Sequence, residues 1–88
     1  MPAIVIYSKD WCGYCHAAKQ LLSSLGYAYE DIDVTHDVPR YQEMRQRSGR
    51  TTVPQIFIDD VSIGGYTDLN ALVREKKLLP AAAAGNSD

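Results

Sequence analysis

Short apolar runs alternate with stretches of helical periodicity along the first part of this chain. Residues 3–7 form a nearly continuous apolar run rich in β-branched side chains, which is typical of a strand covered on both faces. Residues 15–25 then predict a helix with one buried side, because apolar residues recur at helical spacing: Ala18, Leu21, Leu22 and Leu25. Gly26 supplies a C-cap, and residues 27–34 are predicted as a second strand. This strand, helix and strand imply a right-handed crossover with parallel pairing.

A second helix is predicted in the middle of the chain. Asp37 is suited to N-cap a helix over residues 38–47, because its side chain can accept a hydrogen bond from a first-turn N–H. Tyr41 and Met44 would face the core from this helix. Arginines gather in and after it, and we interpret them as a solvated face except for Arg50, which directly precedes a candidate binding motif.

The next segment predicts a β-hairpin. Residues 55–58 are predicted as a strand, apolar from residue 56 on. The strand directly follows Pro54, a position where proline does not interrupt a strand interior. Residues 61–63 form a short returning strand, and Asp59 and Asp60 between them are a turn signal.

A third helix is expected over residues 68–77, capped by Thr67 or Asp68. It completes a domain that we place at residues 1–80. Residues 81–88 are rich in alanine and are expected to be a frayed tail without an evident role.

Composition and charge exclude several classes of function. A chain of 88 residues with 45% hydrophobic and 23% charged residues is typical of one small globular domain. The net charge of −2 argues against a nucleic-acid partner, which usually requires a basic stripe. The chain shows neither a leader pattern nor an apolar run long enough to span a membrane, so we expect a cytoplasmic protein without a membrane partner.

The strongest chemical signal is the pair Cys12 and Cys15, separated by two residues where the first strand gives way to the first helix. Thiols at i and i+3 lie on neighbouring positions of a helical turn and can close a small disulfide. A structural zinc site usually needs four ligands, and His16 and His36 do not complete any recognised zinc spacing. In a reducing compartment such a pair is more often catalytic than structural, so the pattern favours redox chemistry.

The two thiols are predicted to differ in environment. Cys15 continues into the apolar stripe of the first helix and should be buried, whereas Cys12 precedes the first full turn and should be exposed. Unpaired N–H groups and the helix dipole favour a thiolate at that position, so Cys12 is the predicted nucleophile. Lys9 could add a positive charge close to the same sulfur, although a solvated lysine is an equally good interpretation.

Two further segments carry backbone groups that could bind a ligand. If the bond between Val53 and Pro54 is cis, the backbone of Val53 turns outward and can bind an extended peptide as an added strand. Gly64 and Gly65 permit close backbone approach, and the free N–H groups of the following helix suit a carboxylate. A plain glycine turn with a capped helix explains the second segment equally well.

Taken together, three separated motifs resemble those of the glutaredoxin family, particularly the short bacterial glutaredoxin 3 type, over about residues 3–80. The motifs are residues 6–16 with the two cysteines, residues 47–58 around Thr-Val-Pro, and residues 63–68 around Gly-Gly. The resemblance implies an α/β protein with a thioredoxin fold, in which three helices flank a four-stranded mixed sheet and Pro54 is cis. It also implies a glutathione-dependent thiol–disulfide oxidoreductase.

The resemblance implies a glutathione site made of Lys9, Tyr14, Thr52, Val53, Pro54, Gly65, Tyr66, Thr67 and Asp68. Lys9 and Tyr14 would flank the tripeptide, and the backbone of Val53 would pair with its cysteinyl part. Asp68 would face the γ-glutamyl ammonium group. The glycyl carboxylate would need a positive partner, for which Lys9 or a basic residue before Thr-Val-Pro is a candidate.

The implied substrates are glutathionylated proteins and protein disulfides, with Cys12 as the nucleophile and Cys15 as the resolving thiol of a monomer. Gly13 stands where the most familiar family motif has proline, and glycine at this position loosens the turn. Some glutaredoxins with altered motifs resemble cluster carriers, in which the first cysteine of two subunits and two glutathiones hold a [2Fe-2S] centre. That carrier function, with Cys12 as the metal ligand in a dimer, is the alternative.

Overall fold

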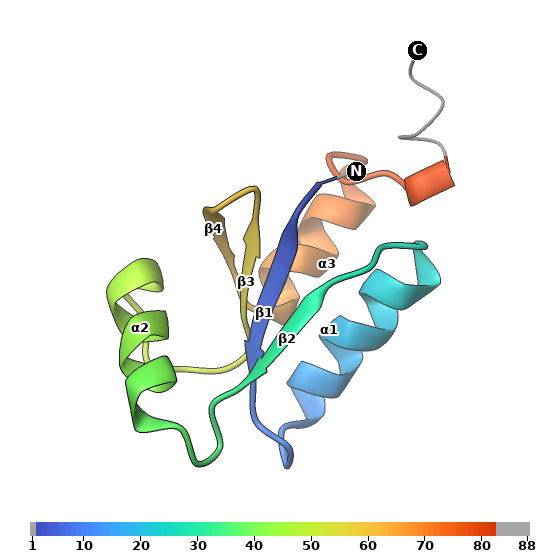
Figure 1. The fold of residues 1–88 in the computed structure, drawn as a ribbon. Helices are drawn as coiled ribbons and strands as arrows, with labels where there is room; N and C mark the ends of the chain where they lie inside the picture. Colours follow the sequence, from blue (N-terminus) through green and yellow to red (C-terminus); the bar gives the residue numbers. More distant parts are fainter. Residues whose placement is uncertain (1, 83–88) are drawn as a thin grey trace.

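The structure, a computed structural model, describes residues 2–82. Within this range three helices flank a four-stranded sheet with the order β2-β1-β3-β4 (Figure 1). The strands are β1 (Ile4–Ser8), β2 (Glu30–Asp33), β3 (Gln55–Ile58) and β4 (Val61–Gly64), and the helices are α1 (Gly13–Ser24), α2 (Val38–Ser48) and α3 (Tyr66–Arg74). β1 pairs in parallel with β2 and antiparallel with β3, which pairs antiparallel with β4. This mixed sheet confirms the thioredoxin fold.

Both faces of the sheet are covered, with α1 and α3 on one face and α2 on the other (Figure 1). Successive side chains of a strand point to opposite faces. Ile6 therefore joins the core under α1 and α3 with Leu22 and Leu69, whereas Tyr7 packs with Met44 on the α2 side. This two-sided burial is the reason for the nearly continuous apolar run in β1, and each fully buried side chain of this size contributes about 1.5–3 kcal/mol.

Several predicted boundaries are wrong. β2 begins at Glu30 and not at Tyr27, because the Tyr27 N–H turns back to the carbonyl of Leu22 and so belongs to the end of α1. α3 begins at Tyr66, two residues before its predicted start at Asp68, because Gly65 is its N-cap. It ends at Arg74, where the chain leaves helical geometry and reaches a positive φ of 60° at Lys76.

The ordered chain also continues past residue 80. Ala81 is buried in the core under α1 and α3, and its N–H donates to the carbonyl of Leu25 at 2.7 Å. The Tyr27 hydroxyl donates to the carbonyl of Leu79 at 2.5 Å. Ala81 thus closes the end of α1 and is not part of a frayed tail, whereas residues 83–88 lie outside the described residues.

Candidate functional site

The two cysteines lie at the start of α1, directly beyond the carboxyl end of β1. Cys12 is the N-cap, with an extended backbone, and its Sγ accepts a hydrogen bond from the N–H of Cys15 at 3.1 Å. The same sulfur lies 3.8 Å from the carbonyl oxygen of Val53, to which the thiol can donate. Both thiols are free, so the structure represents the reduced pair.

The expected exposure of Cys12 is wrong in degree. Cys12 is 7% exposed and Cys15 is 0% exposed, so both are buried and only Cys12 keeps an edge in contact with solvent. The Cys12 side chain turns back over the helix N-terminus to cap it, and the segment at Val53 covers its other side. The helical pattern predicts the order of accessibility, but it carries no information about a segment that closes over the sulfur from 41 residues away.

Cys15 is an enclosed thiol. Burial raises the pKa of Cys15 to about 12, and the neighbouring Cys12 thiol acts in the same direction. The backbone of Lys9 and the positive charge of Lys19 lower the pKa of Cys15, but they do not offset burial. Cys15 is therefore protonated near neutral pH and cannot be the first nucleophile, because the attacking species is the thiolate.

A groove of about 210 Å³ runs beside this pair. It brings together most of the residues predicted for ligand binding, namely Tyr14, Thr52, Val53, Pro54, Gly65, Tyr66, Thr67 and Asp68, with Arg50 and Gln55 added. The Val53–Pro54 bond is cis, as the resemblance implies. Apart from the contact with Cys12, the backbone N–H and C=O of Val53 have no hydrogen-bond partner among residues 2–82. An extended ligand would find the N–H of Val53 free next to the Cys12 sulfur, and could take the place of the Cys12 thiol as donor to the C=O.

One end of the groove is polar. The Asp68 carboxylate accepts the N–H of Gly65 at 3.0 Å and so caps α3, and the Arg50 guanidinium lies 3.3 Å from the same oxygen. Gly64 must remain without a side chain here, because its φ is 104° and a Cβ would lie 2.2 Å from that carboxylate. Neither of the two residues expected at the N-cap position occupies it, because Gly65 is the N-cap; Asp68, the third residue of the helix, instead accepts the N–H of Gly65.

Aromatic side chains surround the mouth of the site. Tyr14 and Tyr66 stack with their ring centroids 6.0 Å apart. Lys9 does not line the groove. Its ammonium group lies 5.3 Å from the ring centroid of Trp11 and 5.2 Å from that of Tyr41, in a separate hollow. Lys9 is therefore held by cation–π contacts, an interaction of about 0.5–1 kcal/mol at exposed sites.

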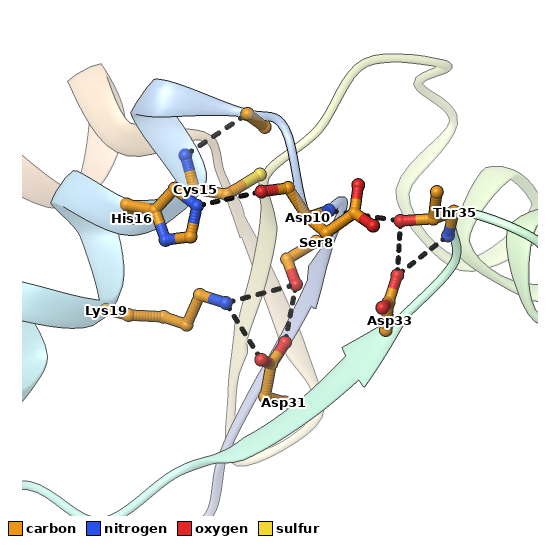
Figure 2. A network of polar contacts seen from close by, with 9 residues as sticks. Ser8, Asp10, Cys15, His16, Lys19, Asp31, Asp33 and Thr35 are labelled. Atoms are coloured by element: carbon orange, nitrogen blue, oxygen red, sulfur yellow. Dashed lines mark hydrogen bonds and ion pairs between the residues drawn. The ribbon is translucent and has the colours of Figure 1, made fainter.

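Two features of the site and its surroundings are not predicted by the sequence patterns. Gln55 is 1% exposed; its Nε2 donates to the carbonyl of Thr52 at 2.9 Å, and its Oε1 has no partner within the described range. A lone polar residue that opens an apolar strand is the signal that could have found it. The second feature is a network of Ser8, Lys19 and Asp31 behind Cys15 (Figure 2).

Two kinds of feature are absent from residues 2–82. No helix there has the length and apolar character needed to cross a membrane. Nor do three or more His, Cys, Asp or Glu side chains in this range gather into a group that could hold a metal ion.

Comparisons of the sequence and of the structure with known proteins find members of the same family. A family model described as Glutaredoxin matches residues 4–63. Glutaredoxin 3 of Escherichia coli (strain K12) is 51% identical over 72 residues, covering 82% of this chain and 87% of that protein. Among solved structures, the buckwheat glutaredoxin–glutathione complex has a TM-score of 0.80 at 32% identity, covering 88% and 73% of the two chains. The solution structure of glutaredoxin from Brucella melitensis has a TM-score of 0.76 at 41% identity, covering 93% and 92%.

Proposed function

The chain belongs to the glutaredoxin family and is a thiol–disulfide oxidoreductase, and from this premise we propose that glutathione is its reductant. We propose as substrates protein–glutathione mixed disulfides and protein disulfides. The observation that carries this proposal is the position of Val53. Its unpartnered backbone lines the groove and also lies against the Cys12 sulfur, so a peptide paired with Val53 is delivered to the nucleophile.

Each part of glutathione has a candidate partner. The cysteinyl part pairs with Val53, with Thr52 alongside. The N-terminal end of α3 receives the γ-glutamyl part, with Asp68 facing its ammonium group. Two cations remain candidates for the glycyl carboxylate: Arg50, which lines the groove and is paired with Asp68, and Lys9, which lies in a hollow outside the groove. The solved complex of buckwheat glutaredoxin with glutathione supports this class of ligand.

The chemistry is disulfide exchange in two steps. The Cys12 thiolate attacks the glutathione sulfur of a mixed disulfide, the substrate sulfur leaves as a thiolate and takes up a proton, and Cys12 becomes glutathionylated. The thiolate of a second glutathione attacks that glutathione sulfur, which releases oxidised glutathione and the Cys12 thiolate. With a protein disulfide, Cys15 resolves the intermediate and forms the Cys12–Cys15 disulfide, which two glutathiones reduce.

The test compares two single-cysteine variants. Reduction of the mixed disulfide between glutathione and 2-mercaptoethanol should vanish in Cys12→Ser and persist largely in Cys15→Ser, because only the second thiol is dispensable for this substrate. Reduction of a protein disulfide should fall in both variants. Loss of activity toward the small mixed disulfide in both variants, or in neither, would refute the assigned roles.

The cluster-carrier alternative depends on the same sulfur. A [2Fe-2S] centre needs four ligands, usually thiolates, and Cys15 is enclosed, so each chain offers one reachable sulfur. Cys12 would therefore have to share a cluster with a second chain and with glutathione. No contact among residues 2–82 favours this alternative, and we keep the oxidoreductase as the proposed function. Since glutathione is the thiol buffer of the cytoplasm, we place the activity there.

A further inference from the structure

A lysine is anchored one helical turn beyond the enclosed cysteine. Lys19 lies four residues after Cys15 on α1, so the two residues share a face of the helix. Its ammonium group lies 2.8 Å from the Asp31 carboxylate on β2 and 3.5 Å from the Ser8 hydroxyl on β1. The Ser8 hydroxyl in turn donates to Asp31 at 2.5 Å. Figure 2 shows Lys19 reaching from α1 across to both strands.

This placement is unusual for a lysine. Only 18% of the Lys19 side chain is exposed, and Ser8 is 2% exposed, so the ammonium group is held against the sheet. A lysine on a helix surface normally extends its charge into water. The hydrogen bond and the charge of Asp31 raise the pKa of Lys19 against the opposing effect of burial, so the group remains a cation.

The charge of Lys19 acts on Cys15. Of the groups that affect the Cys15 thiol, burial and the Cys12 thiol raise its pKa, and the backbone of Lys9 and the charge of Lys19 lower it. Once Cys12 is part of a mixed disulfide it carries no charge and no proton, so its opposing effects vanish. Lys19, ion-paired with Asp31, then remains as a side-chain charge that favours ionisation of Cys15.

We propose that Lys19, held by Asp31 and Ser8, is a positioning residue for the resolving step, in which it stabilises the Cys15 thiolate that attacks the Cys12 mixed disulfide. This inference rests on the proposed roles of the two cysteines. In that step a bond forms between the sulfurs of Cys15 and Cys12, and the bond between Cys12 and the substrate sulfur breaks. The substrate sulfur is reduced and leaves as a thiolate, which takes up a proton equivalent to the one that Cys15 gives up.

The step can be timed on the intact chain with dithionitrobenzoate, an aromatic disulfide that releases a coloured thiolate. The first equivalent of coloured thiolate reports attack by Cys12 on the reagent, and the second reports closure of the Cys12–Cys15 disulfide by Cys15. Lys19→Met keeps the apolar stem and removes the charge. We expect closure about fivefold slower at pH 7, as a charge interaction of about 1 kcal/mol implies, with an unchanged first phase. The rise of the closure rate with pH should move to more alkaline pH, and Lys19→Arg should restore both properties.

Controls separate the possible causes. Lys77→Met removes a lysine that is paired with Glu75 at 3.1 Å outside this network, and it should leave both phases unchanged. Lys19→Gln replaces Lys19→Met if the methionine variant is not folded by circular dichroism. A normal first phase, with closure in a folded Lys19 variant at the unmodified rate and pH profile, would overturn the inference. Absence of the first phase in the unmodified protein would instead refute the role of Cys12.

Discussion

The carboxylate of Asp68 has two tasks that can be separated by mutation. It caps α3 by accepting the N–H of Gly65, and in the proposed function its charge faces the ammonium group of glutathione. Asp68→Asn keeps an oxygen that can accept the capping hydrogen bond and removes the charge. Asp68→Ala removes both.

The contacts of Asp68 give the expected size of the loss of stability and of the rise in KM. Loss of the cap costs about 1 kcal/mol, and the half-exposed pair with Arg50 adds at most about 1 kcal/mol. For a domain of this size, 1 kcal/mol lowers Tm by roughly 4–8 °C. We therefore expect at least that loss in Asp68→Ala and a smaller one in Asp68→Asn. A charge-assisted hydrogen bond to the ligand is worth about 1.5–3 kcal/mol, so in a solvated groove we take the lower value, or roughly a tenfold rise in KM for glutathione in both variants.

The assays are thermal unfolding by circular dichroism and steady-state reduction of a small mixed disulfide at varied glutathione. Asp59→Asn is the matched control, because Asp59 also accepts a backbone N–H, that of Ala3 at 2.9 Å, at the end of β1 remote from Cys12. It should leave KM unchanged. An unchanged KM in Asp68→Asn would show that Asp68 only caps the helix. An equal loss of Tm in the two Asp68 variants would show that the cap depends on charge.

Three further predictions concern stability and assembly. The hydrogen bond from the Tyr7 hydroxyl holds the pKa of Glu43 below its ordinary 4.5 in the folded protein. Ionised Glu43 therefore stabilises the fold above that pH, and this contribution is lost as the pH falls through the lowered pKa of the folded state. Glu43→Gln should therefore lose less urea resistance between neutral and acidic pH than the unmodified protein; parallel losses would contradict this. Ala81→Asp should cost about 2 kcal/mol or more in urea unfolding because it buries a charge, whereas exposed Ala82→Asp should be near neutral; equal effects would contradict the burial of Ala81. Purified without oxygen in the presence of glutathione, the protein should be a colourless monomer by absorbance and gel filtration, and a brown dimer would support the cluster carrier.

The fold follows from the sequence where local pattern and tertiary packing agree. The spacing of Ala18 and Leu22 predicts α1, and Asp37 N-caps α2 by accepting the N–H of Arg40 at 3.1 Å, as expected. The predicted start of β2 is wrong because Tyr27 is of a residue type common in strands but donates its N–H to the preceding helix. Propensity cannot separate these two uses of an aromatic residue.

The site is predicted less completely, because its details come from contacts between distant segments. The groove residues are found through their motifs, since Thr52 to Pro54 and Gly65 to Asp68 are contiguous in sequence. The position of Lys9 between two aromatic rings depends on Tyr41, which is 32 residues away in α2 and appears in the sequence only as a core residue. The partners of Lys19 lie on two strands, so no local pattern contains that network.

The order in which the two thiols react is set by the core and not by the residues between them. Cys15 belongs to the same buried stripe of α1 as Ala18 and Leu22, all at 0% exposure, so the register that packs the helix also encloses this sulfur. Cys12 stands at the N-cap, outside that stripe. Burying Cys12 in place of Cys15 would require α1 to pack in another register. If that register took Leu22 out of the core, the loss would be about 1.5–3 kcal/mol for that side chain alone. Gly13 has open space where a Cβ would be, so substitution there can change the flexibility of the turn but not which sulfur is reached first.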